Sequence, residues 1–262
     1  MRESGASDDP PVVLVHGVPT SSFLWRKVLL ELAARGRCGV AFDLPGLGLA
    51  DRPRDYDYSW TGLGRFAVAA VDALGLEEFD LVLHDIGGPV GFELLAAVGN
   101  ERVRSLTVLD TMLEVDVFQR PWMMEPFARR GMGEVWLAAI ARPAWVALNR
   151  AVGGRASNEE WVAHLDLLKR DDGGRAFLKI MRGFERTREK RDLYVGALNG
   201  FGGRAQVVWG GRDTALPLDP LAHHVVSALG DGTPLHVLPN AKHFPQEDHP
   251  GELADLIAAL AG

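Results

Sequence analysis

Three polar residues follow strand-like apolar runs, where they could act on one substrate. Asp85 comes after "FDLVLH", Asp213 after "VVWGGR" and His243 after "HVLPNAK". In an α/β protein, ligands bind at the carboxyl ends of the strands, so we expect these side chains to converge at one edge of the sheet. A nucleophile, an acid and a histidine in this chain order are typical of enzymes that attack a substrate and then hydrolyse the product of that attack.

Asp85 lies in "FDLVLHDIGGPVGFELL", a segment that predicts a strand, a sharp turn and a helix. An aspartate has a reference pKa of about 3.9, so it is ionised at neutral pH and can displace a leaving group from a saturated carbon. His243 would then deprotonate the water that attacks the resulting ester, and Asp213 would orient the imidazole ring. Asp110, which also ends a strand, is the alternative to Asp213.

Alternating strands and helices position these residues. Between most of the strand-like runs lie stretches with helical spacing, and this alternation predicts βαβ units and an α/β fold. The expected sheet is mostly parallel, has about six strands and carries helices on both faces. The strand-like runs cover residues 11–17, 38–46, 79–85, 103–111, 204–213 and 234–240.

The alternation stops between the fourth and fifth runs. Residues 112–200 read as helical throughout and are rich in bulky apolar residues, including Trp136, Trp145 and Trp161. We interpret this segment as a helical cap inserted between two strands of a core made by residues 1–111 and 201–262. A cap at the carboxyl ends of the strands would shield the reacting groups from water.

Composition excludes several classes of function. The chain has 262 residues, of which 47% are hydrophobic and 24% charged, and its net charge of −7 argues against a nucleic-acid surface. Cys38 is the only cysteine, so no internal disulfide can form. The sequence has no apolar run long enough to span a membrane and no signal peptide at the N-terminus, which predicts a cytoplasmic protein. It contains no metal-binding, phosphate-loop or nucleotide-binding motif.

Four motifs, in this order along the chain, resemble the α/β-hydrolase superfamily: "HGVPTSSFLWR", "DLPGLGLADRP", "HDIGGPVGF" and "HFPQEDHP". They are most similar to the branch of haloalkane dehalogenases and epoxide hydrolases, whose nucleophile is an aspartate. The resemblance implies an α/β-hydrolase fold, Asp85 as nucleophile and no cofactor. By motif position, it implies an oxyanion hole made by the backbone N–H groups of Val18 and Ile86. Relatives have one or two extra strands at the N-terminus, so we expect a trimmed sheet here.

The groups that would stabilise the leaving group depart from both subfamilies. Dehalogenases usually have a tryptophan after the nucleophile and many have an asparagine after "HG", where this chain has Ile86 and Val18. Epoxide hydrolases usually use two cap tyrosines, and only Tyr194 lies in the predicted cap. "PTSSFLWR", "HFPQEDHP" and this single tyrosine favour cleavage of a carbon–halogen bond in a small apolar organic substrate by water. Epoxide hydrolysis stays open, as does a repurposed protein that binds a ligand or catalyses a biosynthetic tailoring reaction. The predicted pocket residues are Phe244, Trp122, Phe127 and Tyr194.

Overall fold

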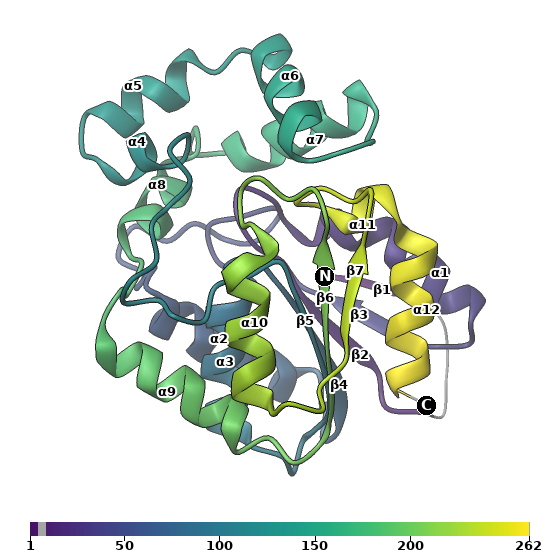
Figure 1. Ribbon diagram of the computed structural model, residues 1–262. Helices are drawn as coiled ribbons and strands as arrows, with labels where there is room; N and C mark the ends of the chain where they lie inside the picture. Colours follow the sequence, from purple (N-terminus) through teal and green to yellow (C-terminus); the bar gives the residue numbers. More distant parts are fainter. Residues whose placement is uncertain (5–8, 262) are drawn as a thin grey trace.

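A seven-stranded sheet forms the centre of the computed structural model, which describes residues 1–4 and 9–261. The strand order is β1-β3-β2-β4-β5-β6-β7, and the six strands from β2 to β7 are parallel (Figure 1). These six strands coincide with the six predicted runs, so the mostly parallel α/β fold is confirmed. Their bounds are β2 (Val12–Val15), β3 (Gly39–Ala41), β4 (Phe79–His84), β5 (Val103–Leu109), β6 (Arg204–Gly210) and β7 (Leu235–Leu238).

The seventh strand, β1 (Arg2–Ser4), pairs antiparallel with β3 and covers that edge of the sheet. The sequence did not predict it, because "RES" has neither apolar residues nor alternation. Backbone pairing alone defines this strand, and it satisfies N–H and C=O groups that an uncovered edge would expose.

Helices cover both faces of the sheet. In Figure 1, α1 and α12 lie on one side, and α2, α3 and α10 lie on the other. Side chains alternate between these faces: Val12 and Leu14 pack in the cluster under α1 and α12, whereas Val13 and Val15 pack in the larger cluster on the opposite side. The bounds are η1 (Ser22–Trp25), α1 (Arg26–Ala34), α2 (Trp60–Ala73), α3 (Gly87–Val98), α10 (Leu218–Leu229), α11 (Pro245–Asp248) and α12 (Pro250–Ala261).

The long segment between β5 and β6 is helical, as predicted. Its first five helices lie over the carboxyl ends of the strands, while α9 packs beside α3 and α10 (Figure 1). The division of the chain into a core and a cap at residues 112–200 stays a prediction. The helices are α4 (Glu125–Ala128), α5 (Met132–Ala139), α6 (Arg142–Val152), α7 (Asn158–Lys169), α8 (Arg175–Arg182) and α9 (Arg188–Asn199).

The strand order places a crevice between two particular strands. The chain leaves β2 toward β3 on one side and returns across it to β4 on the other, so β2 and β4 are neighbours at a topological switch point. Open α/β sheets bind ligands outside the carboxyl ends of the strands at such a point. Val18 follows β2 and Asp85 follows β4, so both lie at this crevice.

Candidate active site

Asp85 occupies a sharp turn between β4 and α3. Its φ of 55° lies in the left-handed region, which is uncommon for any residue other than glycine. Two neighbouring glycines make room for the turn: a Cβ on Gly17 would lie 2.2 Å from Oδ1 of Asp85, and a Cβ on Gly91 would lie 2.0 Å from Cδ2 of Leu83. Leu83 therefore fits two residues before Asp85, at a position where serine hydrolases have glycine, because α3 has no side chain at Gly91.

The carboxylate of Asp85 is held by one of its two oxygens. The backbone N–H of Val18 donates to Oδ1 (N···O 2.7 Å), and the hydroxyl of Thr111 donates to the backbone carbonyl of Asp85 (2.5 Å). Ile86 is the N-cap residue of α3, so its N–H belongs to the helix end that favours negative charge. Oδ2 is the oxygen that faces His243.

His243 reaches this carboxylate from the loop after β7. Its Nε2 lies 3.6 Å from Oδ2 of Asp85, and its Nδ1 lies 2.8 Å from Oδ2 of Asp213. Because a carboxylate can only accept, Nδ1 carries the proton that bonds to Asp213. The backbone carbonyl of His243 is itself 2.8 Å from Nε2 of His84, the residue before Asp85.

Asp213 is fixed by its backbone surroundings. Oδ1 accepts hydrogen bonds from the N–H groups of Ala215 (2.7 Å) and Leu216 (2.9 Å), which leaves Oδ2 for His243. The structure thus brings together Asp85, Asp213 and His243 as the sequence predicted, and all three are buried.

The charges of the three groups shift one another's titration. Burial lowers the pKa of His243, but the carboxylates of Asp213 and Asp85 outweigh it and raise this pKa well above its usual value. Burial raises the pKa of Asp213, but the charge of His243 and its hydrogen bond, with the N–H groups of Leu216 and Ala215, bring it below the usual range. The imidazolium–carboxylate pair is therefore the stable form of the site before it reacts.

Asp110, the alternative acid, lies beside this pair. Among the described residues, it forms no hydrogen bond with the imidazole of His243. It is fully buried with a φ of 35°, and its Oδ1 accepts from the N–H of Gly210 (2.9 Å). Burial, followed by the charge of Asp213, raises the pKa of Asp110 well above its usual value. The geometry favours Asp213 as the partner of His243.

An apolar cavity of about 150 Å³ opens beside the carboxylate. Asp85 and His243 contribute polar atoms, and Phe118, Phe177 and Met181 contribute apolar walls. Of the predicted pocket residues, Trp122, Phe127 and Phe244 line the cavity. Val18 and Ile86 line it as well.

Comparison with known proteins places the chain in a family. A model of the alpha/beta hydrolase family matches residues 12–256. Haloalkane dehalogenase 2 of Mycobacterium tuberculosis is 31% identical over 272 residues, which cover 97% of this chain and 88% of that protein. The chain belongs to the alpha/beta hydrolase family. Within it, this hydrolase falls in the haloalkane dehalogenase-like branch.

Two further comparisons cover different shares of the chain: one is a partial sequence match and the other is a structural match over nearly its whole length. An uncharacterized hydrolase of Saccharomyces cerevisiae, YNR064C, is 39% identical over 93 residues, which cover 36% of this chain and only 32% of that protein. The crystal structure of Cfl2 from Burkholderia cenocepacia superposes with a TM-score of 0.86 over 99% of this chain and 90% of that one, at 23% identity. The second comparison supports the α/β-hydrolase fold alone.

Tyr194, the fourth predicted pocket residue of this α/β-hydrolase, is not among the described residues that line the cavity. It is buried on α9, its ring packs on Phe92 and Trp60, and its hydroxyl donates to Oε1 of Glu93 (2.9 Å). The prediction that Tyr194 faces the substrate was therefore wrong. A buried tyrosine hydroxyl needs a partner, and Glu93 on α3 supplies it away from the cavity.

Two polar residues of the cavity wall escaped the sequence reasoning. Asn149 is buried on α6 and donates to the carbonyl of Trp145 (2.9 Å). Arg120 donates to the carbonyl of Met181 (2.7 Å), and its guanidinium lies over the ring of Phe184. Asn149 could have been found, because it interrupts an apolar stripe at helical spacing. Arg120 precedes "PWMM" in a loop, where no periodicity marks it.

The titratable side chains of residues 1–4 and 9–261 include no group of three or more that could hold a metal ion.

Proposed function

We propose that this hydrolase cleaves the carbon–halogen bond of a small apolar organic molecule, with Asp85 as a nucleophile that forms an alkyl ester. The observation that carries the proposal is that the two carboxylate oxygens of Asp85 have different surroundings. Oδ1 is engaged by the N–H of Val18, while Oδ2 faces His243 at the wall of an apolar cavity. The relatives named haloalkane dehalogenase support the same substrate class.

In the first half of the reaction, Oδ2 of Asp85 attacks the carbon that bears the halogen. A new C–O bond forms as the C–halogen bond breaks, and the halide leaves with the bonding electrons. The apolar walls strengthen this attack, because an anion that is poorly solvated by water is a better nucleophile. His243 takes no proton in this step, since the carboxylate is already ionised.

In the second half, His243 acts as a general base, after the ester has removed the charge of Asp85 and the imidazolium has lost its proton to solvent. It removes a proton from a water molecule, whose oxygen attacks Cγ of Asp85. Negative charge then develops on Oδ1, where Val18 already donates and where Ile86 at the start of α3 would be the second donor. Collapse of this intermediate breaks the bond between the alkyl oxygen and Cγ, and the departing alcohol takes the proton from His243. The carboxyl group then loses to solvent the second proton of the water molecule, which restores the carboxylate.

The departing halide needs a donor other than the residues usual in this branch. Ile86 and Val18 carry no side-chain donor. Trp145 is engaged, because its indole N–H donates to the carbonyl of Trp161 (2.7 Å). Asn149 uses one N–H for the carbonyl of Trp145 and has a second, which makes it the donor of choice for the halide.

A single turnover in ¹⁸O-water tests the covalent route. Attack of water on Cγ should place the label in the carboxyl group of Asp85, which mass spectrometry of the corresponding peptide detects. Label found in the alcohol alone would contradict the ester and indicate direct displacement by water. Asp85→Asn, which has no charged oxygen, should release no halide from a brominated alkane.

His243→Gln supplies a second test of the same route. This variant should complete the first half of the reaction and stop, so its mass should increase by that of the alkyl group. Release of halide in one equivalent without alcohol would agree with this expectation. Retention of unreacted substrate by both the wild-type protein and this variant would instead favour a protein that only binds its ligand.

An epoxide substrate is less compatible with the cavity. All three tyrosine hydroxyls donate elsewhere: Tyr56 to the carbonyl of Gly62, Tyr58 to that of Pro53 and Tyr194 to Glu93. Without a phenol at the cavity, no tyrosine can protonate an opening epoxide oxygen. A panel of brominated alkanes and styrene-type epoxides, assayed by pH change, distinguishes the two, and turnover of epoxides alone would overturn the halide proposal.

A further inference from the structure

The outer surface of α5 and α6 is unusually apolar for a surface that faces water. Between Val135 and Leu148, Arg142 is the only charged residue among those that are exposed, and the others are apolar. Surface helices normally turn polar residues outward, and a contiguous exposed apolar patch indicates an interaction site. We name this surface, together with the adjoining segment that carries Trp122, the α5–α6 face; its large apolar residues are Trp122, Met132, Val135, Trp136 and Leu148.

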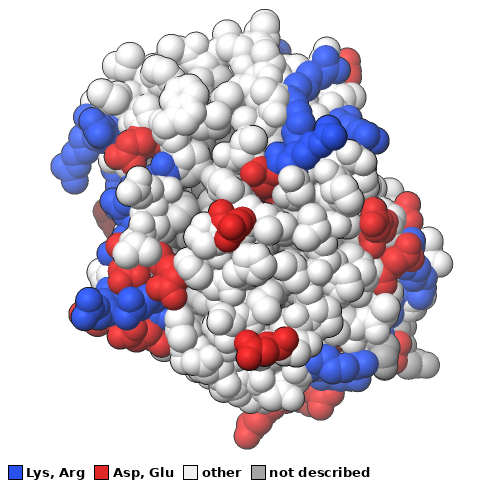
Figure 2. All heavy atoms as spheres, in the orientation of Figure 1, with Lys and Arg blue, Asp and Glu red and all other residues white. Residues whose placement is uncertain are grey.

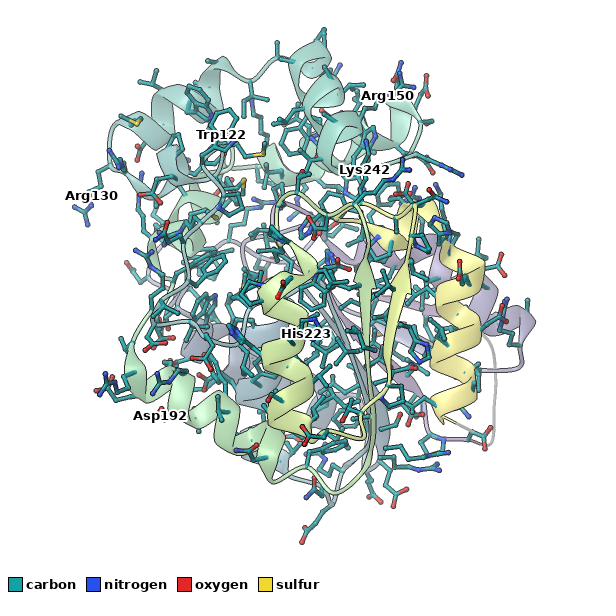
Figure 3. The ribbon with its side chains drawn as sticks, viewed as in Figure 1. Trp122, Arg130, Arg150, Asp192, His223 and Lys242 are labelled. Atoms are coloured by element: carbon teal, nitrogen blue, oxygen red, sulfur yellow. The ribbon has the colours of Figure 1, made fainter. Side chains whose placement is uncertain are left out.

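The same part of the chain is basic although the protein is acidic. Residues 117–157 contain six arginines and two glutamates, a net charge of +4, whereas the whole chain carries −7. Arg129 pairs with Glu125 and Arg142 with Asp166. The exposed Arg130 forms no ion pair among the described residues. Figure 2 shows an uncharged expanse over this part of the molecule, with blue groups at both sides and some red groups beside them. Figure 3 places Arg130 at one side of it, and Arg150 with Lys242 at the other.

The α5–α6 face is continuous with the mouth of the cavity. Trp122, Trp136 and Leu148 are exposed to solvent and also line the cavity wall. Trp122 is 79% exposed and lies on the segment before α4 (Figure 3). Whatever rests on this face would therefore lie next to the entrance through which a substrate passes.

We propose that the α5–α6 face docks onto the surface of an anionic lipid bilayer. Indole rings favour the boundary between lipid and water, and arginines beside them attract anionic head groups. None of the helices in residues 1–4 and 9–261 is long and apolar enough to cross a membrane, so the contact is with the surface. If the proposed function holds, apolar substrates dissolved in the bilayer would reach the cavity directly.

Charge argues against a second copy of this chain as the occupant. A symmetric dimer through the α5–α6 face would bring the same surface of both subunits together. The net positive charge of residues 117–157 would then be present twice at one interface, and like charges across an interface are unfavourable. An anionic lipid surface is complementary to both the charge and the apolar character of the face.

Flotation with lipid vesicles tests the proposal without any need for turnover. The wild-type protein should float with vesicles of phosphatidylcholine that contain phosphatidylglycerol, and binding should weaken in pure phosphatidylcholine and at high salt. Arg129→Gln combined with Arg130→Gln should lower the partition coefficient about 30-fold, since each cation near an anionic surface contributes about five-fold. Asp85→Asn should bind as the wild type does, so failure of the proposed chemistry would not disturb this result.

A matched pair of variants tests the apolar part of the contact. Val135 on α5 is 71% exposed and Leu30 on α1 is 70% exposed, so Val135→Ser and Leu30→Ser remove similar exposed groups from different surfaces. Val135→Ser should reduce vesicle binding about ten-fold, the effect of losing one buried aliphatic side chain, and Leu30→Ser should not change it. Circular dichroism checks that both variants are folded.

Four results would overturn the proposal. The first three are the absence of flotation with phosphatidylglycerol vesicles at low salt, an equal loss for Leu30→Ser and Val135→Ser, and a dimer in solution that Val135→Ser dissociates. The third result would assign the α5–α6 face to a second copy of the chain. Binding that survives Arg129→Gln with Arg130→Gln but depends on Val135 would also contradict a contact with an anionic surface.

Discussion

Asp110 and Asp213 follow neighbouring parallel strands, yet only Asp213 forms a hydrogen bond with His243 among the described contacts. Oδ2 of Asp110 is buried without a donor as long as both carboxyl groups are ionised. Burial and the charge of Asp213 raise the pKa of Asp110 well above its usual value, so Asp110 is a neutral acid that can donate its O–H to Asp213. One carboxylate orients the imidazole, and the other supports that carboxylate.

Substitution of the two acids should therefore have unequal effects. Asp213→Asn removes the charge that stabilises the imidazolium and leaves a donor facing Nδ1, so turnover should fall by about 10⁴, as for an orienting aspartate of a catalytic triad. Asp110→Asn keeps a donor toward Asp213 and should reduce turnover by less than about ten-fold. Steady-state halide release measures both, and the reverse order of effects would identify Asp110 as the working acid.

The charge of Asp85 contributes to the raised pKa of His243. Burial lowers the pKa of His243, while Asp213 and then Asp85 raise it to well above its usual value. Asp85→Asn removes one of these charges, as alkylation would, so we expect the pKa of His243 to fall in this variant. NMR titration of the imidazole measures the shift, and an unchanged pKa would show that Asp85 does not interact with His243.

The sign of this shift gives the pH dependence of catalysis and stability. Ester hydrolysis needs neutral His243, so its rate should rise with pH and level off above the pKa that His243 has in the ester. The pKa of His243 is raised in the folded protein, so its stabilising effect is complete below the unfolded value of about 6.5 and is lost as pH rises through the folded value.

The parallel sheet could be predicted because its strands are buried on both faces. A strand such as Val12–Val15 reads as a continuous apolar run, and the turn of Asp85, Ile86 and Gly87 after β4 has a recognisable form. Chain order then predicted the meeting of Asp85, Asp213 and His243, which the structure contains. The catalytic roles of these residues stay predictions until the chemistry is measured.

The unpredicted features depend on tertiary contacts. Tyr194 lies in a helical segment that reads as cap, but α9 packs on α3, which turns this ring toward Phe92. Helical spacing cannot distinguish a side chain that faces a cavity from one that faces another helix. The same limit hid Asn149, whose position on α6 becomes meaningful only when α6 lies over the cavity.

Gly17 should be essential for the position of the nucleophile. A Cβ there would lie 2.2 Å from Oδ1 and 2.3 Å from Cβ of Asp85, so Gly17→Ala must displace the carboxylate from the N–H of Val18. Displacement of a reacting group by about 1 Å costs about 10² in rate, so halide release should fall at least that far.

Gly196→Ala is the control for this substitution. Gly196 lies on α9, and a Cβ there meets no heavy atom within 4 Å. The alanine should leave turnover unchanged and stabilise the helix by about 1 kcal/mol, measured by thermal unfolding. Equal activity of Gly17→Ala and the wild type would show that the close approach of Gly17 and Asp85 is not needed for catalysis.

Stability at acid pH should depend on His84. Burial, followed by the charge of His243, lowers the pKa of His84 from 6.5 to about 4, so the folded protein holds this ring neutral. Its Nε2 then donates to the carbonyl of His243 (2.8 Å). Between pH 6.5 and 4 the unfolded chain binds a proton that the folded chain does not, so folding stability falls as pH falls, by roughly 3 kcal/mol for this group.

His84→Gln should make the free energy of unfolding depend less on pH across this range, because glutamine does not titrate. At neutral pH the variant should be less stable than the wild type, since it loses the ring that packs on Phe244 and His243. His223→Gln, on an exposed part of α10 (Figure 3), is the control for the loss of a histidine from the chain. Urea unfolding at several pH values measures all three proteins.

Below about pH 4.5 all three should lose further stability through Glu247, whose pKa is lowered to about 2 because His164 and Arg26 outweigh the effect of its burial. Equal slopes for His84→Gln and the wild type between pH 6.5 and 4.5 would show that His84 is not held neutral by the fold.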